Sequence, residues 1–567
     1  MLKNLKIRHL NIIAFIILAY LFLPIFNDDL LYTWQEYSVF INGKTFMTEM
    51  LREHGFFAWV GCYFTQFFYH PWLGSTMLIA IWVLSYYCLT DAFKLKDEFS
   101  TIALIPLVCL LISVIEVGYW IYYLDDPGYC FSNSVIFLIS SIVTWIVSKA
   151  IKPLLSHVFN DKFLDVAASV TLLLCIEAMM SILGIRIESF KHGSYESLQM
   201  TIPFIGIKAS IILLAIPYKN LIKTNKTNSP VAIGLMSALF ATLCALTNFS
   251  NVSDNNFHAE MRMYKALDEL RYEDVIKEAE EAKDAPTNLM VLYKNIALMH
   301  TDRLTDMFKI NNCGTLPNVD DDFNVRIAQI SGEMIYYQFG QANYAYRWAI
   351  ENGVKHGMTN ARLKILAKSA IFNQEFDVAH KYLTLLKGTQ FYNTWARETE
   401  AWIVRGADFY KSKDYQCISP LLGEDLNYLD RDSGLIEKWL LDHFSDLLHP
   451  TSPKIEDLML CTSLWTEDEY SFLIHFYEYY QKHSSQPIPT LYQEAVILLA
   501  NSEESPITVT DFPYDTQVKE RYNNFVSEYH TLANQNMKLE QIGQKMKPVY
   551  GNTYWWYYYF YTDFNIY

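Results

Sequence analysis

The residues of this chain that could do chemistry are acidic side chains that follow apolar segments. Two aspartates and a glutamate come soon after the first apolar segment: Asp28, Asp29 and Glu36. Asp125 and Asp126 lie in a short loop between two later segments. A carboxylate beside a lipid–water boundary can act as a general base or hold a metal ion, and the alternative is a plain solvated loop. These five residues are the candidate catalytic residues.

Three further charged residues lie inside apolar segments, where a charge costs about 2.5–3.5 kcal/mol on insertion scales. Glu116 and Glu177 lie toward the outer ends of their segments, and Lys208 lies near the middle of its segment. Such charges normally face a partner or a water-filled cavity. Glu177 and Lys208 differ in depth by about five residues, or roughly 8 Å. A structural ion pair and a transport pathway both remain open.

The standard phosphate-binding and hydrolytic motifs do not occur in the chain. It contains no Walker loop, GxGxxG turn, HExxH pair or GxSxG elbow, and none of its nine cysteines forms a CxxC pair. The sequence therefore names no cofactor and no metal. An enzyme is still possible, because a membrane transferase can work with a single carboxylate in an outer loop.

Seven apolar segments are long enough to cross a membrane, since about 20 residues of helix span the hydrocarbon layer. They cover 9–26, 75–93, 101–123, 131–148, 163–184, 197–217 and 230–248. One set of ends carries most of the Lys and Arg of the short loops: Lys3, Lys6, Arg8, Lys94, Lys96, Lys149, Lys152, Lys162, Lys219, Lys223 and Lys226. The positive-inside rule predicts a cytoplasmic amino terminus in the inner membrane. An odd number of spans then places residues 249–567 on the outer, periplasmic side.

The segment between the first two spans, residues 27–74, is too long for a turn and is rich in aromatic residues. Within it, residues 55–70 are apolar but too few to cross the membrane, and Pro71 ends the run. We expect an interfacial or re-entrant helix here, with its rings at headgroup depth. An additional span is the alternative, although it would break the alternation of charge.

The net charge of −16 falls entirely on the second half of the chain. Residues 1–248 hold 16 basic and 16 acidic residues, so they are neutral, and the acidic excess lies in residues 249–567. An acidic domain is repelled by the phosphates of nucleic acids. Nucleic acid is therefore excluded as a partner, whereas membrane lipids and a protein partner are expected.

Residues 249–567 show the pattern of short amphipathic helices, with an internal repeat. The stretch Gly340–Trp348 aligns with Gln374–Tyr382 at an offset of 34 residues, which places Ala345 on Ala379. This is the spacing of tetratricopeptide (TPR) repeats, in which a small residue lets paired helices pack closely. Looser copies begin at Tyr272 and Tyr415. The pattern predicts a TPR-like α-solenoid, whose curved surface would hold a peptide or partner protein.

The chain ends in an unusual aromatic run, residues 554–561, with the sequence YWWYYYFY. So many rings are too apolar to remain in water. We expect the run to close the solenoid or to lie on the membrane surface, and a platform for stacking sugars is the alternative.

Three stretches resemble a family of uncharacterised bacterial polytopic membrane proteins. They are FTQFFYHPWLGS at 64–75, NIALMHTDRLTDMF at 295–308 and GNTYW at 551–555. Because these stretches are spread along the chain, the resemblance covers most of its length. It implies a membrane location and a two-part layout, but no activity.

The architecture also resembles the GT-C class of glycosyltransferases, which use lipid-linked sugars. The shared features are a cytoplasmic amino terminus, acids soon after the first span, an interfacial loop and an outer soluble domain. In that class a carboxylate of the first outer loop acts as a base or binds a metal, and the matching positions would be Asp28, Asp29 or Glu36. No sharp motif surrounds these positions, and the loop is short for the class.

These observations predict an all-α protein with a polytopic membrane bundle over residues 1–248 and a helical-repeat domain over residues 249–567. The first functional hypothesis is an envelope assembly or scaffold protein that binds a partner through its repeats. The second is a GT-C-like glycosyltransferase. The third is a transporter, motivated by Glu177 and Lys208, although seven spans without internal symmetry argue against it.

Overall fold

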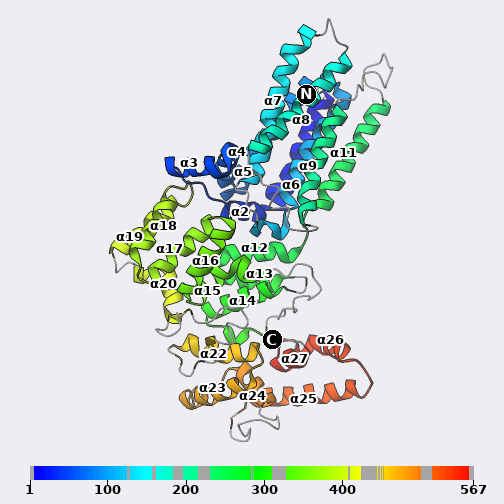
Figure 1. Cartoon of the computed structure of the whole chain (residues 1–567). Coiled ribbons are helices and arrows are strands. Elements are labelled where there is room, and N and C mark those ends of the chain that lie inside the picture. Colours follow the sequence, from blue (N-terminus) through cyan, green and yellow to red (C-terminus); the bar gives the residue numbers. More distant parts are fainter. Residues whose placement is uncertain are drawn as a thin grey trace. The chain divides into compact units, whose positions relative to one another are not determined.

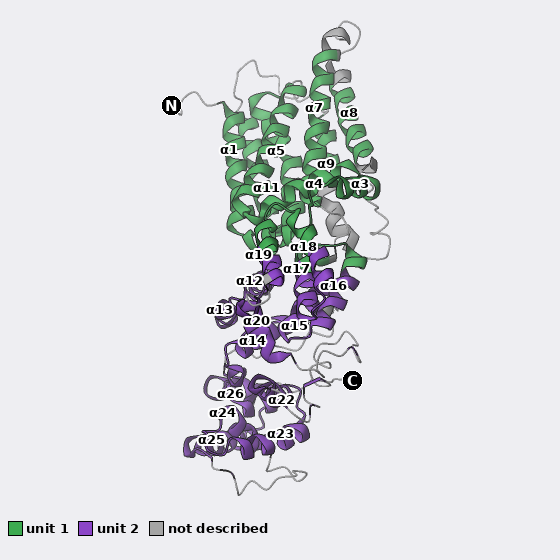
Figure 2. Ribbon diagram, turned by 90° about the vertical axis from the view of Figure 1, so that its left-hand side faces the viewer, with its two compact units in different colours: residues 1–253, 353–363, 383–397 green, residues 254–352, 364–382, 398–567 purple. Residues whose placement is uncertain are grey.

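The computed structural model of the chain is helical throughout the residues that it describes, and none of them lies in a strand. These residues are 6–123, 128–155, 161–182, 196–214, 230–309 without 283 and 285, 327–405, 409–422, 429, parts of 443–450, 452–499, 512 and 514–560. The all-α prediction is therefore confirmed. The chain divides into two compact units (Figure 2).

Unit 1 contains residues 1–253 together with two short segments from much later in the chain, 353–363 and 383–397. Residues 1–253 combine long helices with a cluster of short ones. The helices are α1 (Ile7–Tyr20), α2 (Asp28–Glu36), α3 (Lys44–Glu53), α4 (Gly55–Thr65), α5 (Pro71–Ala92), α6 (Ile105–Ile115), α7 (Tyr129–Leu155), α8 (Asp161–Ile182), α9 (Glu196–Leu214) and α11 (Pro230–Ser250).

Five helical stretches of unit 1 are long and apolar enough to cross a membrane, as judged from the described residues. They are Ile7–Ile25, Pro71–Ala92, Asp97–Ile115, Tyr129–Ala150 and Pro230–Ser250. Each matches one of the expected spans. The other two expected spans, 163–184 and 197–217, fall on α8 and α9, which are continuous helices but are not among these five. Seven spans therefore remain a prediction.

The two ends of the bundle are held together by different side chains. At one end, the Tyr86 hydroxyl donates to the carbonyl of Arg8 at 3.0 Å, and Lys149 pairs with Asp91 at 3.0 Å. At the other end, the Asn27 amide donates to Asn251 at 2.7 Å. Two of the basic residues that define the expected cytoplasmic side, Arg8 and Lys149, thus lie at the first end.

Residues 55–70, expected to be interfacial or re-entrant, form α4 and a short 3-10 helix, η3 (Gln66–Tyr69). With 11 residues, α4 is too short to cross the membrane. It packs closely on α7, because a Cβ atom on Gly61 would lie only 2.0 Å from Ser132 Oγ. Figure 1 shows α3 lying crosswise to the long helices α5 and α7 of the same unit.

Unit 2 contains residues 254–352, 364–382 and 398–567. Helices α16 to α19 run through the boundary, so their ends or turns are shared between the units. The first group of helices is α12 (Asn255–Asp268), α13 (Tyr272–Glu281), α14 (Asn288–His300), α15 (Ile327–Gln338), α16 (Ala342–His356), α17 (Asn360–Phe372), α18 (Phe376–Lys387), α19 (Asn393–Arg405) and α20 (Lys413–Ile418). The second group is α22 (Pro453–Trp465), α23 (Glu469–Lys482), α24 (Thr490–Leu499), α25 (Thr516–Ala533), α26 (Leu539–Tyr550) and α27 (Tyr554–Phe560).

Three helical hairpins of unit 2 share one turn geometry. Their turns contain Leu270, Gly340 and Gln374, each with a positive φ, two residues before α13, α16 and α18 begin. In each turn, the backbone N–H of the residue after the positive-φ position donates to the carbonyl of the residue five positions earlier, at 2.8 Å. This is the hydrogen bond of a Schellman-type helix end. This repetition agrees with the 34-residue offset in the sequence. Whether the hairpins stack as a solenoid stays a prediction.

The first four residues of the aromatic run, 554–557, are buried inside unit 2, whereas Tyr559 is exposed. Trp555 donates its indole N–H to the Glu494 carbonyl at 2.7 Å, Trp556 donates to the Gly543 carbonyl at 2.9 Å, and both rings are buried. Residues 554–557 therefore pack as part of this unit. Whether the run closes a solenoid stays a prediction.

Candidate functional site

Helix α2 is a polar helix that lies almost entirely inside unit 1. Eight of its nine residues are buried, and the exception is Asp28 at its first position. On one side, the Trp34 indole donates to the carbonyl of Val114 in α6 at 3.3 Å, and its ring stacks on Tyr129 of α7. A short polar helix is stable in such a place only if its buried groups find partners.

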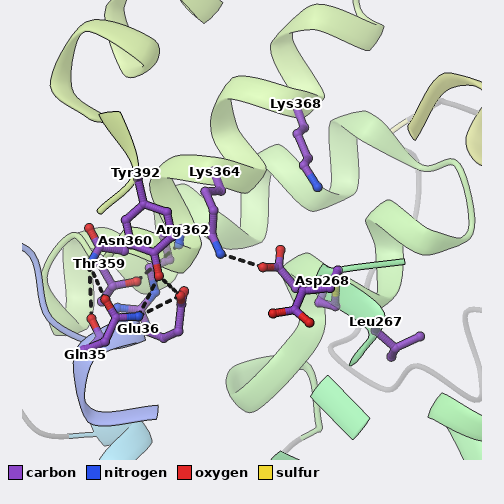
Figure 3. Close-up of polar contacts among 12 residues, drawn as sticks. Gln35, Glu36, Leu267, Asp268, Thr359, Asn360, Arg362, Lys364, Lys368 and Tyr392 are labelled. Atoms are coloured by element: carbon purple, nitrogen blue, oxygen red, sulfur yellow. Dashed lines mark hydrogen bonds and ion pairs between the residues drawn. The ribbon is translucent and has the colours of Figure 1, made fainter. Parts of the chain in front are cut away.

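The carboxylate of Glu36, one of the candidate catalytic groups, accepts hydrogen bonds from two side chains. It is buried, and it accepts hydrogen bonds from the Tyr392 phenol and, at 2.8 Å, from the Gln35 amide. The same Gln35 amide lies 2.6 Å from the Tyr392 hydroxyl, so the three side chains form a closed triangle (Figure 3). Tyr392 comes from a segment more than 350 residues further along the chain.

The pKa of Tyr392 lies well above its ordinary value. Burial of the phenol contributes most to this shift, and the negative charge of Glu36 adds to it. Tyr392 therefore keeps its proton at neutral pH and acts as a hydrogen-bond donor. The donated bond stabilises the carboxylate where water is excluded.

Residues 353–363 contribute a second set of contacts to the first loop. The Asn360 amide donates to the backbone carbonyl of Gln35 at 3.1 Å, and its backbone N–H donates to the carbonyl of Ser38 at 3.3 Å. The guanidinium of Arg362 lies 5.7 Å from the centre of the Tyr37 ring, a cation–π contact. The start of α17 is thus fastened to the end of α2.

The segment 383–397 closes over the same loop. The backbone N–H of Asn42 donates to the carbonyl of Gly388 at 2.8 Å, and a Cβ atom on Gly388 would lie 2.6 Å from Ile41 Cγ2. Phe391 stacks on Tyr69 with their ring centres 4.8 Å apart. We call residues 35–42 of the first loop, together with 353–363 and 383–397, the loop clamp.

Two further predicted acids, Asp29 and Glu116, lie among the described residues of unit 1. Asp29 is buried and accepts from the amide of Leu30 at 2.7 Å, and Glu116 is half-buried at the end of α6. Asp125 and Asp126 lie outside the described residues.

Glu177 and Lys208, for which an ion pair was one of the two alternatives, are paired between α8 and α9. Their carboxylate and ammonium atoms are 2.5 Å apart, and both side chains are about half exposed. No group of three metal-ligating side chains occurs in the part of the chain that the structure describes.

Unit 2 has its own buried polar site, made of charged pairs. Lys364 on α17 lies 2.6 Å from Asp268 at the end of α12, and Lys368 lies 2.9 Å from Asp414 on α20. Figure 3 shows Lys364 directed at Asp268. Burial alone would raise the pKa of Asp268, but the charges of Lys364 and Lys368 outweigh it and hold that pKa below its usual range.

A buried glutamine, Gln338, connects four helices of unit 2 through hydrogen bonds. The Gln338 side chain on α15 donates to the carbonyl of Leu267 at 3.1 Å and accepts from the Tyr272 hydroxyl at 3.1 Å. Its backbone carbonyl lies 2.9 Å from the His300 ring nitrogen. One residue therefore connects α15 with α12, α13 and α14.

Several of these residues were missed in the sequence: Gln35, Asn360, Tyr392, Lys364 and Gln338. None belongs to a motif, and their partners lie up to hundreds of residues away. The one available signal was that Lys364 and Lys368 lie one turn apart in a helix that is rich in apolar residues.

The comparison with protein families covers nearly the whole chain. A family described as a family of unknown function (DUF6057) matches residues 3–561. The chain belongs to this family. The predicted resemblance to an uncharacterised family is thereby confirmed, and because the match runs through both units, they are parts of one family architecture. No curated protein and no solved structure matches the chain.

Proposed function

We propose that this protein is a multi-span membrane protein whose outer-side helical repeats hold a partner protein, as an assembly or scaffold protein of the cell envelope. The observation that carries the proposal is the loop clamp. The best-placed acid of the first loop, Glu36, is enclosed by Tyr392 and Gln35. Its partner Tyr392 lies in segment 383–397, which belongs to the same unit as the candidate spans and contains the end of α18 and the start of α19. A carboxylate held in this way suits a structural role better than a catalytic one.

The loop clamp also supports the proposed sidedness. Residues of the first loop contact residues 353–363 and 383–397, so all of them must lie on one side of the membrane. An even number of crossings must then separate the loop from the repeats. Five spans leave four crossings after the loop, and seven leave six, so both satisfy the condition. With the positive-inside rule, the amino terminus is cytoplasmic and the repeats are periplasmic.

Partner binding is tested by photocrosslinking in living cells. A benzophenone amino acid is placed at Val404 or Phe376, which are 83% and 44% exposed on the repeats. We expect both positions to capture the same protein. The matched control is Val549, 57% exposed on α26 and far from the repeats in the chain. Adducts that are absent, or identical at all three positions, would contradict a repeat-specific partner.

Glycosyltransferase activity of the GT-C type is the second candidate. It is favoured by Asp28, which is exposed at the start of α2 directly after the first span, and by the two short helices α3 and α4 that follow. A carboxylate there could deprotonate a sugar acceptor.

The decisive comparison for this second candidate is Asp28→Asn against Glu36→Gln, each at normal protein level. A transferase that uses Asp28 should lose its glycosylated product in the first variant. A scaffold should keep its function in the first variant, and any defect of the second should follow loss of folded protein.

A further inference from the structure

Helix α3 has an apolar face that is only half covered by protein. Successive residues of a helix are 100° apart, so Phe46, Met50, Met47 and Leu51 follow one another around one arc of α3. Polar residues fill the opposite arc: Lys44, Thr45, Thr48, Glu49, Arg52 and Glu53. The helix is therefore amphipathic, with a continuous apolar side.

One half of that arc packs inside unit 1. Met50 is buried and Phe46 packs on the same hydrophobic cluster, which also contains Phe57 of α4 and Ile136 of α7. The ring of Phe46 meets Phe40 edge to face, with the ring centres 5.7 Å apart. These contacts fix the orientation of α3 on the unit.

The other half of the arc is uncovered. Met47 and Leu51 are 41% and 37% exposed, and Phe56 at the start of α4 is 48% exposed. Trp72, the second residue of α5, is 57% exposed and stacks on Tyr20, the last residue of α1. An exposed tryptophan at the end of an apolar helix is typical of the membrane–water interface.

We propose that α3 lies in the plane of the membrane and inserts Met47 and Leu51, with Phe56 beside them, among the acyl chains of the outer leaflet. Its length of 10 residues and its crosswise position in Figure 1 exclude a span. Lys44, Arg52 and the two glutamates then face headgroups and water, so the attraction is apolar and does not require anionic lipid.

The position of α3 gives this contact a consequence for the loop clamp. Asn42, which donates to Gly388, is separated from Lys44 by a single glycine. A helix anchored in the outer leaflet therefore holds the adjoining segment 383–397 at headgroup depth. This inference depends on the membrane part of the proposed function and is independent of the protein partner.

The test uses the full-length protein reconstituted in vesicles of phosphatidylcholine. The benzophenone amino acid is introduced at Met47, Leu51, Thr48 or Glu49, and lipid adducts are measured by mass spectrometry after illumination. We expect roughly tenfold more phosphatidylcholine adduct at Met47 and Leu51 than at Thr48 and Glu49, because an in-plane helix buries one face only. Equal labelling of all four positions, or none at Met47 and Leu51, would overturn the proposal.

A second pair of variants keeps the test decisive if benzophenone disturbs the fold. In Met47→Glu/Leu51→Glu the inserted face becomes charged, whereas Thr45→Glu/Thr48→Glu adds the same charge to the polar face. We expect only the first pair to expose residues 42–54 to added protease in the vesicles. Protection of this segment in both pairs would show that α3 is held by protein contacts alone. Crosslinking of a partner protein at Val404 is measured in the same variants in cells. Loss of the partner adduct would then count against the proposed function, and loss of lipid contact against the insertion of α3.

Discussion

Glu36 in unit 1 and Asp268 in unit 2 are both buried carboxylates, but the groups that hold them differ. Hydrogen bonds from a phenol and an amide hold Glu36 in the loop clamp. Lysine charges hold Asp268 between α12 and α17. A hydrogen bond from a neutral group is directional and modest in strength, whereas a buried ion pair leaves a large penalty when one partner is removed. The difference predicts which substitutions lower the free energy of unfolding most and which lower it less.

The largest effect is expected at the lysine pair. Lys364→Met leaves Asp268 buried without its closest cation, which costs about 3–5 kcal/mol in the free energy of unfolding. The measurement is pulse proteolysis of the purified full chain in detergent. The double variant Lys364→Met/Asp268→Leu should recover most of the loss, because both buried charges are then gone. A double variant as unstable as the single one would show that the pair is not the cause.

A smaller effect is expected in the loop clamp. Tyr392→Phe removes the hydroxyl that donates to Glu36 and should cost about 1–3 kcal/mol, since a buried acceptor loses a partner. Limited proteolysis should then cut first within residues 383–397. Tyr346→Phe is the matched control, because its hydroxyl bonds that of Tyr382 at a half-buried place in unit 2. Equal losses of stability in the two variants would contradict a specific stabilising role for the hydrogen bond from Tyr392 to Glu36.

A third carboxylate, Glu494, connects stability with pH. Burial raises its pKa to about 7, while the amide of Tyr554, which donates to it at 3.0 Å, opposes the shift. The folded state therefore retains a proton that the unfolded state has lost between about pH 4.5 and 7. Stability from this group is complete below that range and is lost as the pH rises through it.

Glu494→Gln removes the titrating group and should flatten this pH dependence. We expect the variant to gain on the order of 1–2 kcal/mol over the wild type at pH 8 and to gain little at pH 4.5. Unfolding followed at both pH values, by the fluorescence of Trp555 and its neighbours, checks the result. A larger gain at the lower pH would contradict the assigned direction.

The smallest effect is expected at an exposed ion pair. Arg347 and Glu351 lie one turn apart on α16 at 2.8 Å, with both side chains about half exposed. Glu351→Gln should change the free energy of unfolding by only about 0.3–0.5 kcal/mol, because water and salt screen the pair. The same pulse proteolysis measures this change. A loss as large as that of Lys364→Met would show that burial is not what makes one ion pair contribute more to stability than the other.

The sequence by itself determined those features that depend on neighbours in the chain. Runs of apolar residues placed the five candidate spans, and the 34-residue offset anticipated hairpins in which Ala345 and Ala379 are both fully buried. The short run before Pro71 is a non-spanning helix, because its length excludes a crossing whatever surrounds it. Periodicity and length are local, so one sequence suffices to find them.

Only the tertiary structure decided how distant residues meet. Glu36 could be recognised in the sequence as a candidate acid, but its enclosure depends on Tyr392, which is 356 positions away. The residues next to Glu36 or Tyr392 in the sequence give no sign of this contact. The same holds for Lys364 with Asp268 and for Gln338 with three other helices. Hydrogen bonds and ion pairs need atoms within about 3 Å. Such proximity follows from the packing of the whole chain rather than from any segment of it.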